Sequence, residues 1–349
     1  MISLKKIIVV LCVTFLFSWI GILFFQETTV RQQNTSSNSF ATSSQPTLTE
    51  KIISLPPKLI EKISGPTPDS SAYLLKNMRL TFADEFNSFS RYVDKNGNTT
   101  CDSGGTGIWQ TVYHFCSRTN PGNREAEVYI DQTFLDHLNK KSAASTTARN
   151  PFTIDNGILT IEAAPSDSII LSAVGQWAKY TSGMITTQFS FSQTYGYFEI
   201  RAKLPPGRGL WPAFWILPVD KTWPPEVDAM EFFGDTSKDG QGGRTKIHYA
   251  SHTVPGQKDK ACNEWFDVGI DVTKDFHVYG VNVQPDKITY YFDGKAYATC
   301  KANPDTYKPF YILVNLAVGG HGSWPGTPDA STKFPAYMYV DYVRAYNKI

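Results

Sequence analysis

Three carboxylates lie within six residues of an otherwise almost wholly apolar run, residues 223–234 (WPPEVDAMEFFG). They are Glu226, Asp228 and Glu231. Carboxyl groups held close together suit nucleophilic and acid–base chemistry, because burial and neighbouring charge separate their proton affinities. The pattern raises the question of whether one strand can present all three on the same side.

A regular strand would not do so. Alternation places Glu226 and Asp228 on one face and Glu231 on the other, where an unpaired charge would be buried in the sheet core at high cost. One extra residue at positions 229–230, a β-bulge, resets the parity and brings the three carboxylates onto one face. We therefore predict a bulged strand, and bulges are frequent beside active sites.

Several tryptophans surround this strand. The preceding run, residues 207–218 (GRGLWPAFWILP), contains Trp211 and Trp215, and Trp223 follows shortly after. Aromatic side chains usually fill a core. Beside a carboxylate face they have a second use, because indole rings stack on sugars and paired Asp and Glu residues cleave glycosidic bonds.

The surrounding elements are predicted to be short strands. In residues 196–205 (GYFEIRAKLP) polar and apolar side chains alternate strictly, and other segments follow the same pattern: 277–283, 287–292, 296–300 and 338–346. Residues 310–318 are apolar on both faces, which predicts a central strand. Asp293-Gly294 predicts a hairpin turn, and residues 131–141 fit either a short surface helix or a strand and turn. Together these patterns predict an all-β, two-sheet sandwich.

Composition bounds the possible functions. The chain has 349 residues, of which 41% are hydrophobic and 14% aromatic, enough for one large domain with additional segments. Its formal net charge is +1. This balance gives no support to nucleic-acid binding, and no Gly-rich phosphate loop or metal-spaced Cys/His cluster is present in the sequence.

The N-terminus is predicted to lie apart from the fold. Lys5 and Lys6 precede residues 7–25, an uncharged apolar run long enough to cross a bilayer as a helix. Because no small-x-small cleavage site follows, we expect residues 1–25 to be a cytoplasmic stub and an uncleaved signal anchor. The alternative is a cleaved signal peptide and a secreted protein. Residues 26–73 read as a Ser/Thr/Pro-rich linker and residues 74–349 as a domain outside the cytoplasm, periplasmic or extracellular.

Cysteine usage agrees with export. Cys12 lies in the apolar run, which leaves four cysteines in the domain. An even number in an exported domain predicts disulfides. Of the three possible pairings we favour Cys101–Cys116 and Cys262–Cys300, because each joins neighbours in a loop or sheet-edge region. Four free thiols are the alternative.

The order of the sequence blocks carries a family resemblance. YGYFEIRAKLPPGRGLWPAFWILP, EVDAMEFFG, IHYASH, FHVYGVNVQPDKITYYFDGK, YILVNLAVGG and PAYMYVDYVRAY make residues 75–349 similar to glycoside hydrolase family 16, the laminarinase and lichenase relatives. The Glu-x-Asp-x-x-Glu motif alone is common, but in this order it is specific. The stretch from WPAFWILP to EVDAMEFFG is most similar to members that depolymerise bacterial exopolysaccharides of the succinoglycan type, and next to bacterial endo-β-1,3-glucanases.

The resemblance implies a concanavalin A-like jelly roll and endo-acting, retaining cleavage of a β-1,3/1,4-linked polysaccharide. Glu226 matches the nucleophile, Glu231 the general acid/base and Asp228 the residue that assists Glu226. No cofactor is needed for this chemistry, and we expect a monomer. Two alternatives remain: a transglycosylase using the same site, and a carbohydrate-binding sandwich without chemistry.

Further residues match cleft positions less specifically. The expected substrate-binding set is Arg201, Trp211, Trp215, Trp223, His248, Asn315 and Trp324. His248 could instead be satisfied by core hydrogen bonds, and Trp223 and Trp324 could be loop packing. Asp341 matches a position that binds a structural calcium ion in many relatives, although a solvated or capping Asp is the alternative.

Two segments depart from the shorter family members. They are residues 101–120 (CDSGGTGIWQTVYHFCSRTN) and 123–134 (NREAEVYIDQTF). We expect these segments to build part of the cleft rim and to select the substrate. Export together with a tether suggests an activity on newly secreted polysaccharide.

Overall fold

The computed structural model describes residues 75–349 apart from 143, 238, 254–261 and 303. The expected signal anchor and linker, residues 1–73, lie outside the described residues. Within the described part of the chain, no helix is both long and apolar enough to cross a bilayer.

The described chain forms strands and a few short helices. The strands are β1 (Met78–Asp84), β2 (Glu127–Tyr129), β3 (Phe152–Asp155), β4 (Ile158–Pro165), β5 (Tyr180–Ser182), β6 (Met184–Thr186), β7 (Gly196–Lys203), β8 (Leu210–Pro218), β9 (Glu226–Glu231), β10 (Lys246–His252), β11 (Asn263–Asp267), β12 (His277–Val283), β13 (Lys287–Phe292), β14 (Lys295–Lys301), β15 (Phe310–Val318) and β16 (Ala336–Lys348). The helices are the 3₁₀ turn η3 (Pro121–Asn123), α5 (Gln132–Lys141) and α6 (Ser168–Val174).

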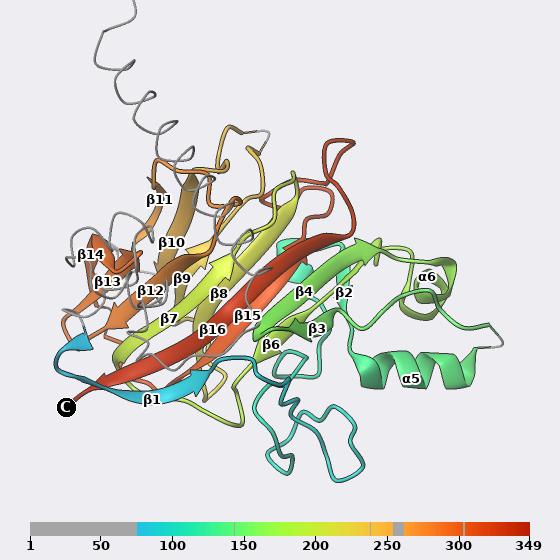
Figure 1. The fold of residues 1–349 in the computed structure, drawn as a ribbon, viewed down its shortest axis with the longest axis horizontal. Helices are drawn as coiled ribbons and strands as arrows, with labels where there is room; N and C mark the ends of the chain where they lie inside the picture. The colour runs from blue at the N-terminus through green and yellow to red at the C-terminus, as the bar shows by residue number, and fades with distance from the viewer. Residues whose placement is uncertain (1–74, 143, 238, 254–261, 303) are drawn as a thin grey trace, which may run out of the picture. The chain divides into compact units, whose positions relative to one another are not determined.

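The strands form two sheets (Figure 1). In the described residues the larger sheet has ten strands in the order β14-β13-β12-β7-β16-β4-β5-β2, with β1 paired to β16 and β3 to β4. The smaller has six, in the order β11-β10-β9-β8-β15-β6. Nearly every pairing is antiparallel; β2 with β5 is parallel. The expected all-β, two-sheet architecture is confirmed.

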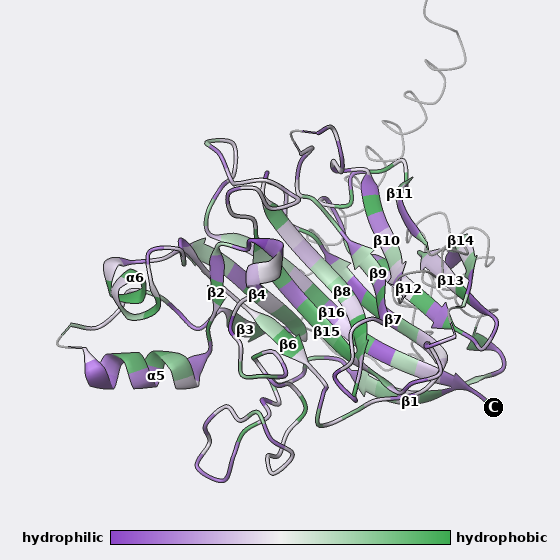
Figure 2. Ribbon diagram, turned by 180° about the vertical axis from the view of Figure 1, so that it is seen from behind, coloured by the Kyte–Doolittle hydropathy of each residue, from purple (hydrophilic) through white to green (hydrophobic). Residues whose placement is uncertain are grey.

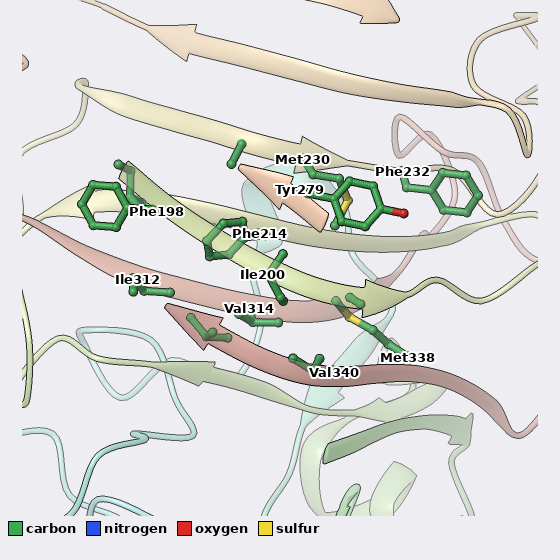
Figure 3. Close-up of a cluster of buried hydrophobic side chains, with 14 of the residues drawn as sticks. Phe198, Ile200, Phe214, Met230, Phe232, Tyr279, Ile312, Val314, Met338 and Val340 are labelled. Atoms are coloured by element: carbon green, nitrogen blue, oxygen red, sulfur yellow. The ribbon is translucent and has the colours of Figure 1, made fainter. Parts of the chain in front are cut away.

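The main core lies between the two sheets. Figure 3 shows Phe198 and Ile200 of β7 in one cluster with Phe214 of β8 and Val314 of β15, all fully buried. Each strand contributes alternate residues to this cluster, and hydrophilic and hydrophobic residues alternate along several strands in Figure 2. The period-2 pattern of the sequence therefore identified the faces that meet in the core.

Strand β15 is buried along its whole length, as its apolar sequence predicts. It pairs with β8 on one side and β6 on the other. Alternate residues from Phe310 to Val318 enter the main core, whereas Tyr311 and Leu313 pack in a second cluster on the opposite face. The strand is therefore central in the small sheet, and its second face underlies the cleft described below.

The predicted hairpin turn is confirmed, and the alternatives for residues 131–141 are resolved in favour of a helix. Asp293 and Gly294 both have positive φ, 46° and 73°, as a tight two-residue hairpin between β13 and β14 requires. Residues 132–141 form α5, whose N-terminus is capped by Asp131 accepting from the amide of Phe134. Helix α6 was not expected; its N-cap, Asp167, accepts from two backbone amides. Both helices lie beside β2, β3 and β4 (Figure 1).

Both expected disulfides are present. Cys101–Cys116 closes a loop with a sequence separation of 15 residues. Cys262–Cys300 spans 38 residues and joins the residue before β11 to β14. Because β11 and β14 are edge strands of different sheets, this disulfide links the two sheets at one side of the sandwich.

Candidate active site

The predicted bulge lies on β9. On its neighbour β10, His248 is opposite Glu231 and Ala250 is opposite Asp228, so two β9 residues face one β10 residue between them. The register with β8 shifts at the same place. The apolar residues of β9, among them Met230, enter the core, while the three carboxylates line a cleft on the other face. The extra residue thus places the three carboxylates on one face of the strand, as predicted from the sequence.

The cleft lies over the small sheet and has a volume of about 1260 Å³. This exceeds the roughly 300–1,000 Å³ that is usual for a small-molecule pocket, so the cleft has room for several sugar units. Apart from Arg201, the expected binding residues line it: Trp211, Trp215, Trp223, His248, Asn315 and Trp324. Part of the rim comes from residues 113–125, which confirms that the two unusual segments border the cleft.

Glu231 is held by two ring nitrogens. The indole N–H of Trp211 donates to its Oε1 at 3.0 Å, and Nδ1 of His248 lies 2.9 Å from its Oε2. The other imidazole nitrogen, Nε2, is 3.0 Å from Oδ1 of Asn263. The Trp211 and His248 rings therefore fix the orientation of the Glu231 carboxyl group in the cleft, as a residue that exchanges a proton with substrate requires.

Glu226 and Asp228 form a close pair nearby. The indole N–H of Trp223 donates to Glu226 Oε2 at 2.6 Å. Burial, and then the negative charge of Asp228, raise the pKa of Glu226 well above its ordinary value, although His252 and the Trp223 hydrogen bond oppose this. Burial, and then the charge of Glu231, likewise raise the pKa of Asp228. The pair therefore favours one shared proton over two adjacent anions.

His252 is a site residue that the sequence reasoning missed. Its Nε2 lies 3.1 Å from Asp228 Oδ2 and 4.0 Å from Glu226 Oε1. The signal was available, because His252 is four residues after His248 on one strand and so shares its face. Donor atoms of Glu226, Asp228 and His252 lie within 4.8 Å of one another. Charge and hydrogen bonding within the carboxylate cluster account for this grouping, and we assign no metal to it.

Arg201 is not in the cleft, contrary to expectation. It lies on β7 in the large sheet, where its guanidinium pairs with Asp341 of β16 and lies over the ring of Phe276. Alternation along β7 correctly put Arg201 on the polar side, but that side is the outer face of the sandwich. The surroundings of Asp341 do not fit the expected calcium site. The Arg201 guanidinium already pairs with this carboxylate, whereas calcium needs six to eight oxygen ligands.

Asn315 takes part in a hydrogen-bond chain along the cleft floor. The indole N–H of Trp215 donates to its Oδ1 at 2.8 Å, and its amide donates to the Tyr129 hydroxyl at 3.1 Å. Tyr129 in turn lies 3.5 Å from Glu125. A buried Asn needs such partners. On the opposite side, Trp324 donates to Gln241 at 2.7 Å. Gln241 is a further cleft residue that the sequence did not reveal, and Glu125 lies in a segment that was expected at the rim but was not itself singled out.

Comparison with known proteins agrees with this site. Residues 139–344 match the family model of glycosyl hydrolases family 16. Two relatives from Rhizobium meliloti, the endo-1,3-1,4-beta-glycanases ExsH and EglC, are 37% and 36% identical over 270 residues. Those alignments cover 76% of this chain and 51% of each relative, so the chain spans about half their length.

A solved structure shows the same fold. The laminarinase catalytic domain from Thermotoga maritima superposes with a TM-score of 0.57 at 28% identity, covering 78% of this chain and 99% of that domain. The family model matches more than half of the present sequence, and the block containing the three carboxylates lies inside it. The chain therefore belongs to glycosyl hydrolases family 16.

Proposed function

We propose that this protein is an endo-acting β-glycan hydrolase that cleaves a β-1,3/1,4-linked polysaccharide with retention of configuration. One observation carries the proposal: the bulge on β9 brings three carboxylates onto the floor of a long, tryptophan-lined cleft. A sugar-binding module gains nothing from a buried acidic cluster, which is costly unless the charges are used.

Glu226, Glu231 and Asp228 have different roles in the reaction. The Glu226 carboxylate attacks the anomeric carbon while the Glu231 carboxyl group gives its proton to the leaving oxygen, so the glycosidic bond breaks and a glycosyl-enzyme ester forms. Glu231, now ionised, takes a proton from water, and the water oxygen displaces Glu226 from the sugar. Asp228 positions the nucleophile Glu226, and its negative charge raises the pKa of Glu226. The chemistry requires no cofactor.

Family relationship and cleft shape support a polymer as substrate. The relatives named above are endo-β-glycanases by name. An open cleft lined by Trp211, Trp215, Trp223 and Trp324 offers several indole rings to successive sugars. We include bacterial exopolysaccharide among the proposed substrates because of the resemblance around the carboxylate strand.

We further propose that the domain works outside the cytoplasm, tethered by an N-terminal membrane helix. The apolar run of residues 7–25 supports the tether. Two disulfides in the described residues support export, because disulfides persist in oxidising compartments. If the mature N-terminus were found after residue 25 on a protein free in the medium, the tether would be wrong.

The test is product analysis with a panel of glycans: laminarin, lichenan, xyloglucan and succinoglycan. We expect internal cleavage of one of them by the full chain and none by Glu226→Gln, with the β-anomer formed first in a proton NMR time course. Retention of a glycan by both proteins without cleavage would indicate a binding module. Products longer than the substrate would indicate a transglycosylase.

A further inference from the structure

A second pair of carboxylates lies at the edge of the cleft, outside the catalytic cluster. Glu125 lines the cleft wall just before β2, and Glu127 begins β2 behind it. Glu125 is 8% exposed and Glu127 is 0% exposed. Carboxyl groups are almost never buried to this extent without a partner of opposite charge.

Neither residue has such a partner. None of the ion pairs among the described residues engages Glu125 or Glu127. The neighbouring arginines are occupied elsewhere, Arg118 with Asp131 and Arg124 with a backbone carbonyl. The ionisable groups that face the pair are two buried tyrosines, Tyr113 from the preceding loop and Tyr129 on β2.

Hydrogen bonding shows what compensates for the burial. Glu125 accepts from the amide of Asn120 at 3.2 Å and from the side chain of Asn123 at 3.1 Å. Glu127 Oε2 accepts from the amide of Val318 on β15 at 2.7 Å. The other oxygen, Oε1, is buried and has no donor. The side chain of Glu127 also interacts with that of Glu125, and two carboxyl groups cannot hydrogen-bond to each other unless one carries a proton.

Charge and burial point the same way. Burial, and then the negative charge of Glu125, raise the pKa of Glu127 well above its ordinary value. Burial also raises the pKa of Glu125, although hydrogen bonds from Glu127 and Asn123 oppose this. The deeper residue is therefore the one that keeps the proton, and the one at the cleft wall is the acceptor.

We propose that Glu127 is a neutral carboxylic acid that donates a hydrogen bond to Glu125, and that it thereby holds the Glu125 carboxylate in the cleft wall as an acceptor for sugar hydroxyls. Glu127 is a positioning residue, since it does not reach the cleft itself. The sugar-binding half rests on the proposed function. The shared proton does not, because it follows from burial and hydrogen bonding alone.

The shared proton is tested by thermal unfolding of Glu127→Gln and the parent between pH 5 and pH 9. A folded-state pKa above the unfolded one means that the parent loses stability as pH rises from the unfolded value, near 4.5, toward the folded one. Glutamine keeps the shape and a donor without titrating. We expect the melting temperature of the variant, relative to the parent, to rise by more than roughly 3 °C across this range.

Glu162→Gln, on β4 of the large sheet, is the matched control, because it makes the same substitution away from the cleft. A flat difference for Glu127→Gln would mean that Glu127 is ionised in the fold, and the proposal would be overturned. Thermal unfolding uses no glycan, so its outcome does not depend on whether the protein has enzymatic activity.

The sugar-binding half is tested by steady-state kinetics on the cleaved glycan. Glu125→Gln should raise KM roughly tenfold with little change in kcat, because a charge-assisted hydrogen bond is lost. Glu127→Leu should raise KM similarly, and Glu127→Gln should restore it. If Glu125→Gln leaves KM unchanged, Glu125 does not bind sugar. If the parent cleaves nothing, the proposed function fails while the unfolding result still decides the shared proton.

Discussion

The two carboxylate pairs of this cleft have the same spacing and different surroundings. Glu226 and Asp228 on β9, and Glu125 and Glu127 at the start of β2, are each separated by one residue. In both pairs, burial is the largest cause of a raised pKa. Around the first pair lie an indole N–H and an imidazole, from Trp223 and His252. Backbone amides, an asparagine side chain and the Tyr129 hydroxyl surround the second.

The difference separates reactivity from placement. The β9 pair lies in the cleft beside a ring nitrogen of His252 and the indole of Trp223, so it is placed where a sugar can react with it. The pair at β2 is held by amide donors, which do not titrate, and by the Tyr129 hydroxyl, whose pKa burial raises well above its ordinary value. It therefore serves as a fixed acceptor. Identical sequence spacing therefore does not determine a carboxylate's task, and the donors supplied by neighbouring strands do.

The largest expected effect in this comparison comes from Glu231→Gln, beside the first pair. Losing a general acid should lower kcat on the natural glycan by roughly 10²- to 10⁴-fold. An aryl glycoside with a good leaving group should suffer less at the first step, because its departure needs no proton. Glu127→Gln, the matched variant in the second pair, should leave kcat unchanged. If both variants lowered kcat equally, the two pairs would not differ in role.

Asp228→Asn should have an intermediate effect and shift the pH profile. The negative charge of Asp228 is the second cause of the raised Glu226 pKa, so its removal should lower that pKa. Because Glu226 must be ionised to attack, the acid limb of kcat/KM should move to lower pH, with a reduced maximum. Profiles of Asp228→Asn and the parent test this. An acid limb that moves upward would show that Asp228 stabilises the ionised nucleophile.

The smallest effect is expected at Arg201, on the outer face. Its partner Asp341 is a carboxylate neutralised by a cation, and both side chains are 31% exposed. Partly exposed ion pairs contribute about 0–1 kcal/mol. Arg201→Gln should therefore leave kcat/KM within twofold and change the melting temperature slightly. A large rise in KM would restore Arg201 to the substrate-binding set.

Much of the site could be predicted because it depends on parity. The conflict between three carboxylates and a regular strand required the bulge at positions 229–230, and the structure has it. Both disulfides also followed from local reasoning about edges and loops. Arg201 was placed in the cleft because it matches a cleft position of the family, and alternation could not correct this because it does not say which polar face lies toward the cleft. That choice depends on which strands pair, and the pairing of β7 with β12 and β16 is non-local.

The contacts of Glu125 and Glu127 could not be predicted from the sequence, for the same reason. Glu127 is compensated by the amide of Val318, which is 191 residues away along the chain. Helix α6 was missed because it is only seven residues long and has little periodicity to detect. Nothing in a single segment indicates that its polar groups will meet a distant strand.

The bulge on β9 also limits how this gene can change. Deleting the codon for Ala229 would leave a regular strand on which Glu226, Asp228 and Glu231 still share the cleft face and Met230 still faces the core. The deletion would nevertheless shift Glu231 by one residue, roughly 3.3 Å, toward Asp228 and away from its partners Trp211 and His248. The acid group would then keep its face of the sheet but lose its position. Insertions and deletions should thus be tolerated in the rim loops and eliminated in β9.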